Sequence, residues 1–101
     1  DSFANLAAID QGGVFIASFD GTSPWERHLN GDELVQIIKG AVRLTVLGDD
    51  VGEEVLDLTG GAMIVIPKGH WHNFDAPNGV TVMTVTPLPT DHSSADDPRT
   101  T

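Results

Sequence analysis

Two groups of metal-capable side chains lie in distant parts of this chain. The first contains Glu26 and His28 and is followed by Glu33; the second contains His70 and His72. Imidazole and carboxylate ligands in this mixture suit iron, manganese, nickel, copper or zinc better than calcium. The sequence therefore predicts a divalent metal site, and ligand type alone leaves the identity of the metal open.

The spacing within each group is that of side chains on one face of a β-strand. Residues two apart in a strand point to the same side of the sheet, so Glu26 projects with His28, and His70 projects with His72. The turn signal at 30–32 would bring the following strand back beside His28. A β-fold could thus bring the two groups to one point.

The elements that must position these ligands are predicted to be short strands. Apolar runs, several of them partly alternating, occupy 14–19, 32–39, 41–47, 54–58, 62–66, 70–75 and 80–86. Gly40 is expected to end one of these strands, and 76–79 is expected to form a turn. Short strands separated by turns are typical of an all-β sandwich or barrel.

The chain is expected to form one domain with a segment at each end. Its 101 residues suffice for a single domain. We predict an N-terminal segment at 1–12, a barrel at 13–87 and a polar C-terminal tail at 88–101. A helix and a strand remain alternatives for the N-terminal segment. The tail is expected to lie on the surface or to reach a neighbouring subunit, with its His92 in a structural role.

Composition narrows the range of partners. Five lysines and arginines stand against 15 aspartates and glutamates, which gives a formal net charge of −10. Such a charge disfavours nucleic acid and anionic membranes as partners. The chain has no cysteine, so a disulfide framework or a zinc–thiolate cluster is excluded. The apolar runs are shorter than a membrane span, and we expect a soluble, cytoplasmic protein.

Two motifs resemble those of the cupin superfamily. The stretch Glu26-x-His28, continued by Glu33 and Gly40, is similar to the first cupin motif, and 61–72 is similar to the second. The resemblance covers most of the chain. It implies an all-β fold, the double-stranded β-helix or jelly-roll barrel of small cupins, which are often homodimers.

The resemblance also implies which residues form the site. His28, Glu33 and His72 match metal ligands of the family, whereas Glu26 stands where the family usually has a histidine. We expect Glu26 to be a fourth ligand, with a position outside the ligand shell as the alternative. His70 falls outside the motif spacing and is a candidate pocket residue. The apolar side chains expected in the pocket are Val35, Ile37, Val65 and Val82.

Function is expected only at the level of the family. The resemblance implies a metal-dependent enzyme of dioxygenase, isomerase or lyase type that uses iron, manganese, nickel or zinc on a small organic molecule. A non-catalytic ligand-binding or sensor cupin is the alternative, and a barrel that keeps the motif residues without metal is a third. The fold does not decide among these classes because cupins host many chemistries.

Overall fold

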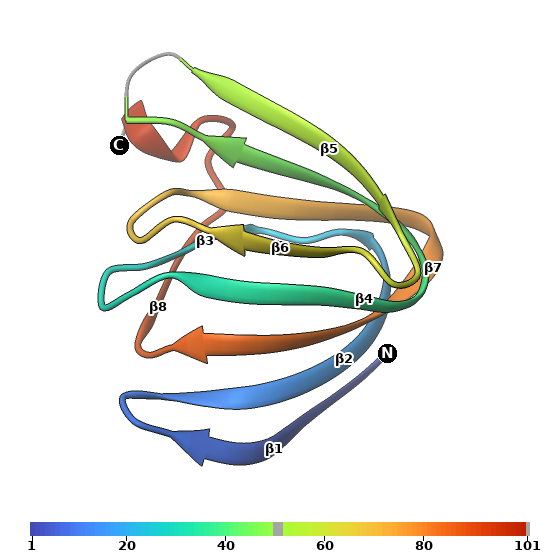
Figure 1. Ribbon diagram of the computed structural model, residues 1–101. Helices are drawn as coiled ribbons and strands as arrows, with labels where there is room; N and C mark the ends of the chain where they lie inside the picture. Colours follow the sequence, from blue (N-terminus) through green and yellow to red (C-terminus); the bar gives the residue numbers. More distant parts are fainter. Residues whose placement is uncertain (50–51, 101) are drawn as a thin grey trace.

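The described residues form eight β-strands in one antiparallel sheet that curls on itself (Figure 1). The computed structural model describes residues 1–49 and 52–100; Asp50 and Val51, between two predicted strands, and Thr101, at the end of the predicted tail, lie outside them. The elements are β1 (Ser2–Ile9), β2 (Gly12–Thr22), β3 (Trp25–His28), β4 (Glu33–Leu47), β5 (Glu53–Thr59), β6 (Met63–Ile66), β7 (His72–Pro87), β8 (Thr90–Ser93) and a 3-10 helix at Pro98–Thr100. The predicted all-β class is confirmed.

The two longest strands, β4 and β7, pair with each other in antiparallel orientation. The second neighbour of β7 is β2, while β4 pairs with β6 through its first part and with β5 through its second. The short β3 meets β7 at the pair Glu26–His72 and pairs along its length with β8. This register places the strand of His28 next to the strand of His72.

The core lies on the concave face of the curled sheet. It consists of the buried side chains of Val35, Ile37, Val42, Leu44, Val46, Ile66, Phe74, Ala76, Val80 and Val82. Burial of each large apolar side chain stabilises the fold by about 1.5–3 kcal/mol. Because side chains alternate along a strand, the alternation that buries Val35 and Ile37 also turns Glu33 inward. The fold itself therefore buries a carboxylate.

Two predicted breaks in the chain are bends within continuous strands. The expectations that Gly40 ends a strand and that 76–79 forms a turn were wrong, because β4 and β7 run through these positions. Gly40 and Gly79 both have a φ of +90°, a conformation that glycine adopts without strain. A Cβ on Gly40 would lie 2.5 Å from the Gly79 carbonyl oxygen. The two strands thus bend side by side at a contact between backbones.

Both ends of the chain contribute strands. Of the two alternatives for the N-terminal segment, the strand is correct: β1 pairs with β2, and all its residues are exposed. The predicted tail folds back onto its own barrel, where β8 pairs with β3 (Figure 1). In the part of the chain that the structure describes, no helix has the length and apolar character to cross a membrane.

Candidate metal centre

Three of the predicted ligands converge at one point inside the sheet. His28 ends β3, Glu33 begins β4 and His72 begins β7. Their exposed fractions are only 4%, 6% and 1%. One ligand atom from each side chain lies within 4.8 Å of the other two. The structure therefore brings together two imidazoles and one carboxylate from three different strands.

The three side chains are close but leave polar atoms unpaired. His28 Nε2 lies 3.3 Å from Glu33 Oε2, and His72 Nε2 lies 3.1 Å from Glu33 Oε1. Both Nε2 atoms and Glu33 Oε1 nevertheless lack a hydrogen-bond partner of suitable geometry. Buried polar atoms without partners are costly. A cation among the three would satisfy them all, and the donor set suits a divalent transition metal.

Hydrogen bonds on the far side of each imidazole orient the two histidines. His72 Nδ1 lies 3.1 Å from the carbonyl oxygen of His70, and His28 Nδ1 lies 3.0 Å from Thr90 Oγ1. A carbonyl only accepts, so His72 Nδ1–H donates, and the neutral ring keeps its lone pair on Nε2. The Thr90 hydroxyl can accept from His28 in the same way. Partners of this kind fix ligand orientation in metal sites.

A pair of threonines on β7 holds the carboxylate of Glu33. Thr86 Oγ1 donates to Glu33 Oε2 over 2.6 Å, and the hydroxyls of Thr84 and Thr86 lie 2.7 Å apart. Because the Thr86 proton points to Glu33, the Thr84 hydroxyl must donate to Thr86. This relay leaves Glu33 Oε1 free for a cation.

Glu33 and the two histidines of the site shift one another's pKa values. Burial raises the pKa of Glu33, but contacts with the imidazoles of His28 and His72 outweigh it and lower this pKa from 4.5 to about 2. Burial lowers the pKa of His72, but the Glu33 carboxylate outweighs it and raises that pKa above its ordinary 6.5. Glu33 is therefore a carboxylate at neutral pH, whereas His72 must lose any bound proton before it can bind a metal.

Glu26 lies outside the cluster of three candidate ligands. It shares a strand face with His28, as predicted, and faces His72 across the β3–β7 pairing. Its Oε2, however, lies 3.1 Å from His92 Nε2 on β8, and its side chain is 31% exposed. A competing partner from a neighbouring strand thus holds the carboxylate in the cavity wall, and the role of Glu26 as a fourth ligand stays a prediction.

His70 supports the site through its backbone instead of its ring. Its carbonyl oxygen orients His72, while its own Nε2 lies 3.8 Å from Asp49 Oδ1. The ring is absent from the described lining of the cavity beside the metal centre, so its expected place in the pocket is corrected. His70 lies in the loop before β7, which begins at His72; its ring lies near Asp49, whereas the His72 ring lies near Glu33.

A cavity of about 530 Å³ opens beside the cluster, with His28 and Glu33 in its wall. Val82 lines it, as expected, whereas Val35 and Ile37 belong to the core and are absent from its described lining. Val65 is 55% exposed, since its neighbour Ile66 is the buried residue of that alternation. The strand was predicted correctly, but the wrong face of it was assigned to the pocket.

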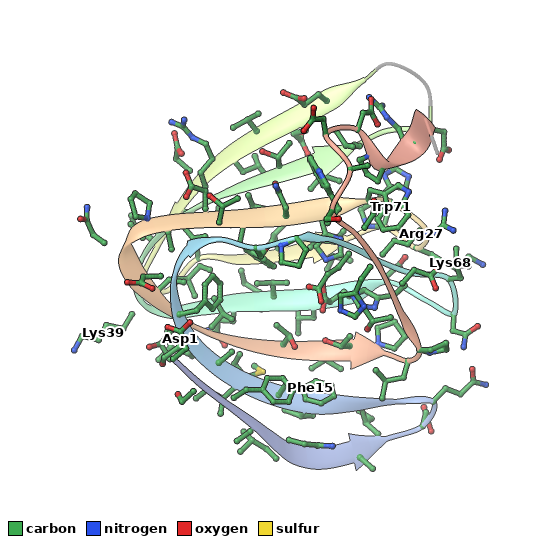
Figure 2. The ribbon with its side chains drawn as sticks, turned by 180° about the vertical axis from the view of Figure 1, so that it is seen from behind. Asp1, Phe15, Arg27, Lys39, Lys68 and Trp71 are labelled. Atoms are coloured by element: carbon green, nitrogen blue, oxygen red, sulfur yellow. The ribbon has the colours of Figure 1, made fainter. Side chains whose placement is uncertain are left out.

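A cation–π pair immediately precedes two of the candidate ligands in the sequence. The Arg27 guanidinium lies 4.5 Å from the centre of the Trp71 ring, and the two side chains lie together in Figure 2. Arg27 also binds Asp91 of β8 at 3.0 Å. Arg27 and Trp71 directly precede His28 and His72, so these contacts hold the backbones that carry both imidazoles.

Sequence reasoning missed the supporting residues. Thr84 and Thr86 continue the alternation of Val82, which is a signal that they face the same cavity. Thr90 and His92 carry no such signal, because the polar tail gives no indication that it pairs with β3. The local sequence pattern therefore predicts the candidate metal ligands more readily than the side chains that orient those ligands.

A curled antiparallel barrel with a buried two-histidine, one-carboxylate centre defines the class of this protein. The model of the cupin domain family (Cupin_2) matches residues 15–86, and the chain belongs to this family. The resemblance in its two motifs is thereby confirmed. A comparison with curated protein sequences gave no significant match.

Solved structures show the same fold. A cupin-2 domain containing protein from Shewanella frigidimarina has 24% identity and a TM-score of 0.71 over 86% of this chain and 80% of that chain. A conserved protein of unknown function from Streptococcus pyogenes has 22% identity and a TM-score of 0.72, with 87% and 74% covered. Hydroquinone 1,2-dioxygenase PnpCD, in complex with Cd²⁺ and 4-hydroxybenzonitrile, has 19% identity and a TM-score of 0.72, with 84% and 63% covered. The predicted cupin barrel is confirmed.

Proposed function

We propose that this protein is a metal-dependent cupin enzyme that acts on a small organic molecule. The observation that carries the proposal is the set of three buried ligand atoms, His28 Nε2, Glu33 Oε1 and His72 Nε2, which face one another without hydrogen-bond partners. They would hold one divalent ion of iron, manganese, nickel or zinc. The reaction is of dioxygenase, isomerase or lyase type.

The position of the cavity supports catalysis over a purely structural metal. His28 and Glu33 line the cavity, whereas His72 is 1% exposed and is absent from the described lining. Three protein ligands leave open positions on a four- to six-coordinate ion, and these would face the cavity. A bound ion supplies Lewis acidity toward an oxygen of the ligand. Structural metal sites are usually closed by a fourth protein ligand.

Hydrogen bonds from neighbouring residues fix the orientation of the three ligand side chains and leave their ligand atoms available to a metal ion. Thr86 fixes one carboxylate oxygen of Glu33, and Thr90 and the His70 carbonyl fix the two imidazoles. The dioxygenase of the same fold was solved with Cd²⁺ and an organic compound. At 19% identity that likeness concerns the fold, so it supports the class of function and does not identify a substrate.

Elemental analysis of gently purified protein tests the metal centre. We expect about one equivalent of metal in the parent and loss of it in a His28→Ala, His72→Ala double variant that keeps its far-ultraviolet circular dichroism. The matched control is His92→Ala, which removes an imidazole outside the cluster and should retain the metal. A parent without metal after growth in each of the four ions, or a folded double variant that keeps it, would contradict the proposal.

Turnover separates an enzyme from a sensor. An oxygenase should consume dioxygen with substrate, and an isomerase or lyase should form product without it. A ligand-binding or sensor cupin would bind the same molecule and return it unchanged.

We also propose that the protein is a homodimer. The apolar side chains of Leu6 and Ile9 on the edge strand β1 are 57% and 48% exposed, and such a surface favours association. Light scattering of the parent and of Leu6→Asp tests this, with the parent dimeric and the variant shifted toward monomer. A monomeric parent at high concentration would contradict it.

A further inference from the structure

Most of the apolar side chains in the described wall of the cavity beside the metal centre are aromatic. All 4 phenylalanines of the chain line it: Phe3, Phe15, Phe19 and Phe74. We infer that the cavity takes an uncharged, planar aromatic compound with a single hydroxyl oxygen directed at the metal, and that it discriminates against dicarboxylic acids. The inference rests on the proposed metal centre and names the substrate class of that site.

One aromatic surface begins close to the metal ligands. Phe15 of β2 is in register with Thr84 of β7, two residues from Thr86, whose hydroxyl holds Glu33. Two residues along a strand span about 7 Å, roughly the size of one aromatic ring. Phe3 stacks on Phe15 with ring centres 5.3 Å apart and an interplanar angle of 22°. A ring bound by its hydroxyl near Glu33 would therefore lie against Phe15.

A second aromatic surface adjoins the ligand His72. The Phe74 ring meets the His72 ring edge to face at 6.0 Å and 82°, and it meets Phe19 at 6.0 Å and 66°. Edge-to-face and offset contacts are the arrangements that aromatic pairs prefer. Since Phe15 and Phe19 belong to β2 and Phe74 to β7, aromatic side chains from two neighbouring strands line the space that a bound ring would enter.

The charge of the wall disfavours dicarboxylic acids. Lysine and arginine are absent from the lining that the structure describes, whereas Glu26 and Glu33 are present. His92, a further lining residue, is already held by Glu26 at 3.1 Å. Carboxylates are recognised by cationic donors, which this wall lacks. A divalent ion bound by Glu33 retains a single positive charge, which suits one hydroxyl oxygen and leaves a second carboxylate without a partner.

Calorimetric titration of the zinc-loaded protein with phenol and with succinate tests the inference. We expect phenol to bind at least about tenfold more tightly than succinate. Phe15→Ala should weaken phenol binding about tenfold at unchanged zinc content. The control Val65→Ala shortens an apolar side chain on the outer face and should change neither ligand.

A second variant tests the charge argument with little risk to folding. Phe3 is 70% exposed, so its replacement should leave the core intact. Phe3→Arg places a cation at the cavity and should reduce the preference for phenol over succinate about fivefold or more. Phe3→Ala, the matched control, should weaken phenol binding without strengthening succinate binding.

Two outcomes overturn different statements. Zinc at one equivalent, with succinate bound as tightly as phenol or with the preference unmoved by both Phe15→Ala and Phe3→Arg, overturns the aromatic ligand class and leaves the metal centre standing. Failure to bind zinc overturns the metal centre and, with it, the hydroxyl-directed mode of binding.

Discussion

Thr86 and Glu33, 53 residues apart in sequence, are joined by a 2.6 Å hydrogen bond inside the sheet. The threonine hydroxyl donates to one carboxylate oxygen, and the other oxygen remains available to a cation. A short bond from a hydroxyl to a carboxylate is of the strong, charge-assisted kind. The orientation of Glu33 therefore depends on a residue that cannot itself be a good metal ligand.

Replacement of Thr86 by valine should weaken metal binding without removing a ligand. The variant leaves Glu33 Oε2 without its donor, and loss of such a partner typically lowers metal affinity about 10- to 100-fold. Competition with a chromogenic chelator measures the change. Thr81→Val is the matched control, because Thr81 lies on the same strand and bonds Ser18 at 2.7 Å, away from the ligands. Equal affinities of Thr86→Val and the parent would show that this bond does not position Glu33.

The same isosteric change should affect metal affinity strongly at Glu33 and hardly at all at Glu26. Glu33→Gln removes the carboxylate ligand and should lower metal affinity at least about 100-fold. Glu26→Gln alters a group that binds His92 outside the cluster and should change the affinity less than about threefold. Metal content after dialysis distinguishes the two. Loss of metal from Glu26→Gln would identify Glu26 as a fourth ligand.

Stability of the metal-free protein should be greatest in mildly acidic solution. Glu33 has a folded-state pKa of about 2, below its ordinary 4.5, so its contribution is present above pH 4.5 and lost as pH falls toward 2. His72 has a raised pKa, so its contribution is present below pH 6.5 and lost as pH rises through the folded-state value. The stabilising contributions of Glu33 and His72 are both fully present only between pH 4.5 and pH 6.5, the ordinary pKa values of the two groups.

Urea unfolding of chelator-treated protein at about pH 3, 5.5 and 8 measures this dependence. The free energy of unfolding should be largest at the middle value, and Glu33→Gln should flatten the profile. Metal-loaded protein should instead gain stability toward pH 8, because the ligands bind metal in their deprotonated forms. A metal-free profile that rises steadily to pH 8 would contradict the assigned pairing of Glu33 with His72.

The bend of the sheet should depend on Gly40 more than on Gly61. Both have positive φ, so alanine is strained at either position. A Cβ at position 40 would also lie 2.5 Å from the Gly79 carbonyl oxygen, whereas a Cβ at position 61 has no other atom within 4 Å. We expect Gly61→Ala to cost about 1 kcal/mol and Gly40→Ala about 3 kcal/mol or more. Urea unfolding at neutral pH compares them, and equal costs would exclude a close backbone contact.

The candidate metal ligands could be predicted from the sequence better than the residues that surround them. His28, Glu33 and His72 were singled out by their match to the two cupin motifs, because strand spacing alone offered Glu26 and His70 as well. The position of Glu26 could not be predicted, since it depends on which strand lies beside β3. That neighbour is β8, whose short polar sequence has no apolar alternation to indicate a strand.

The course of the strands was only partly predictable for a similar reason. A glycine can end a strand or bend it, and its local sequence is the same in both cases. At Gly40 the choice is made by Gly79, a distant residue that lies against it in the folded chain. Val65 was likewise assigned to the wrong face of its strand, because a short run in which every residue is apolar gives no indication of which face meets the core.

The pairing of β8 with β3 matters for any truncation of this protein to its predicted barrel. The stretch matched by the family ends at residue 86, before the hydroxyl of Thr90 reaches the ring of His28. A fragment cut at that boundary would retain every predicted ligand and yet leave the His28 imidazole without the hydrogen bond at its Nδ1 atom. The working unit of this protein is therefore longer than its recognisable domain.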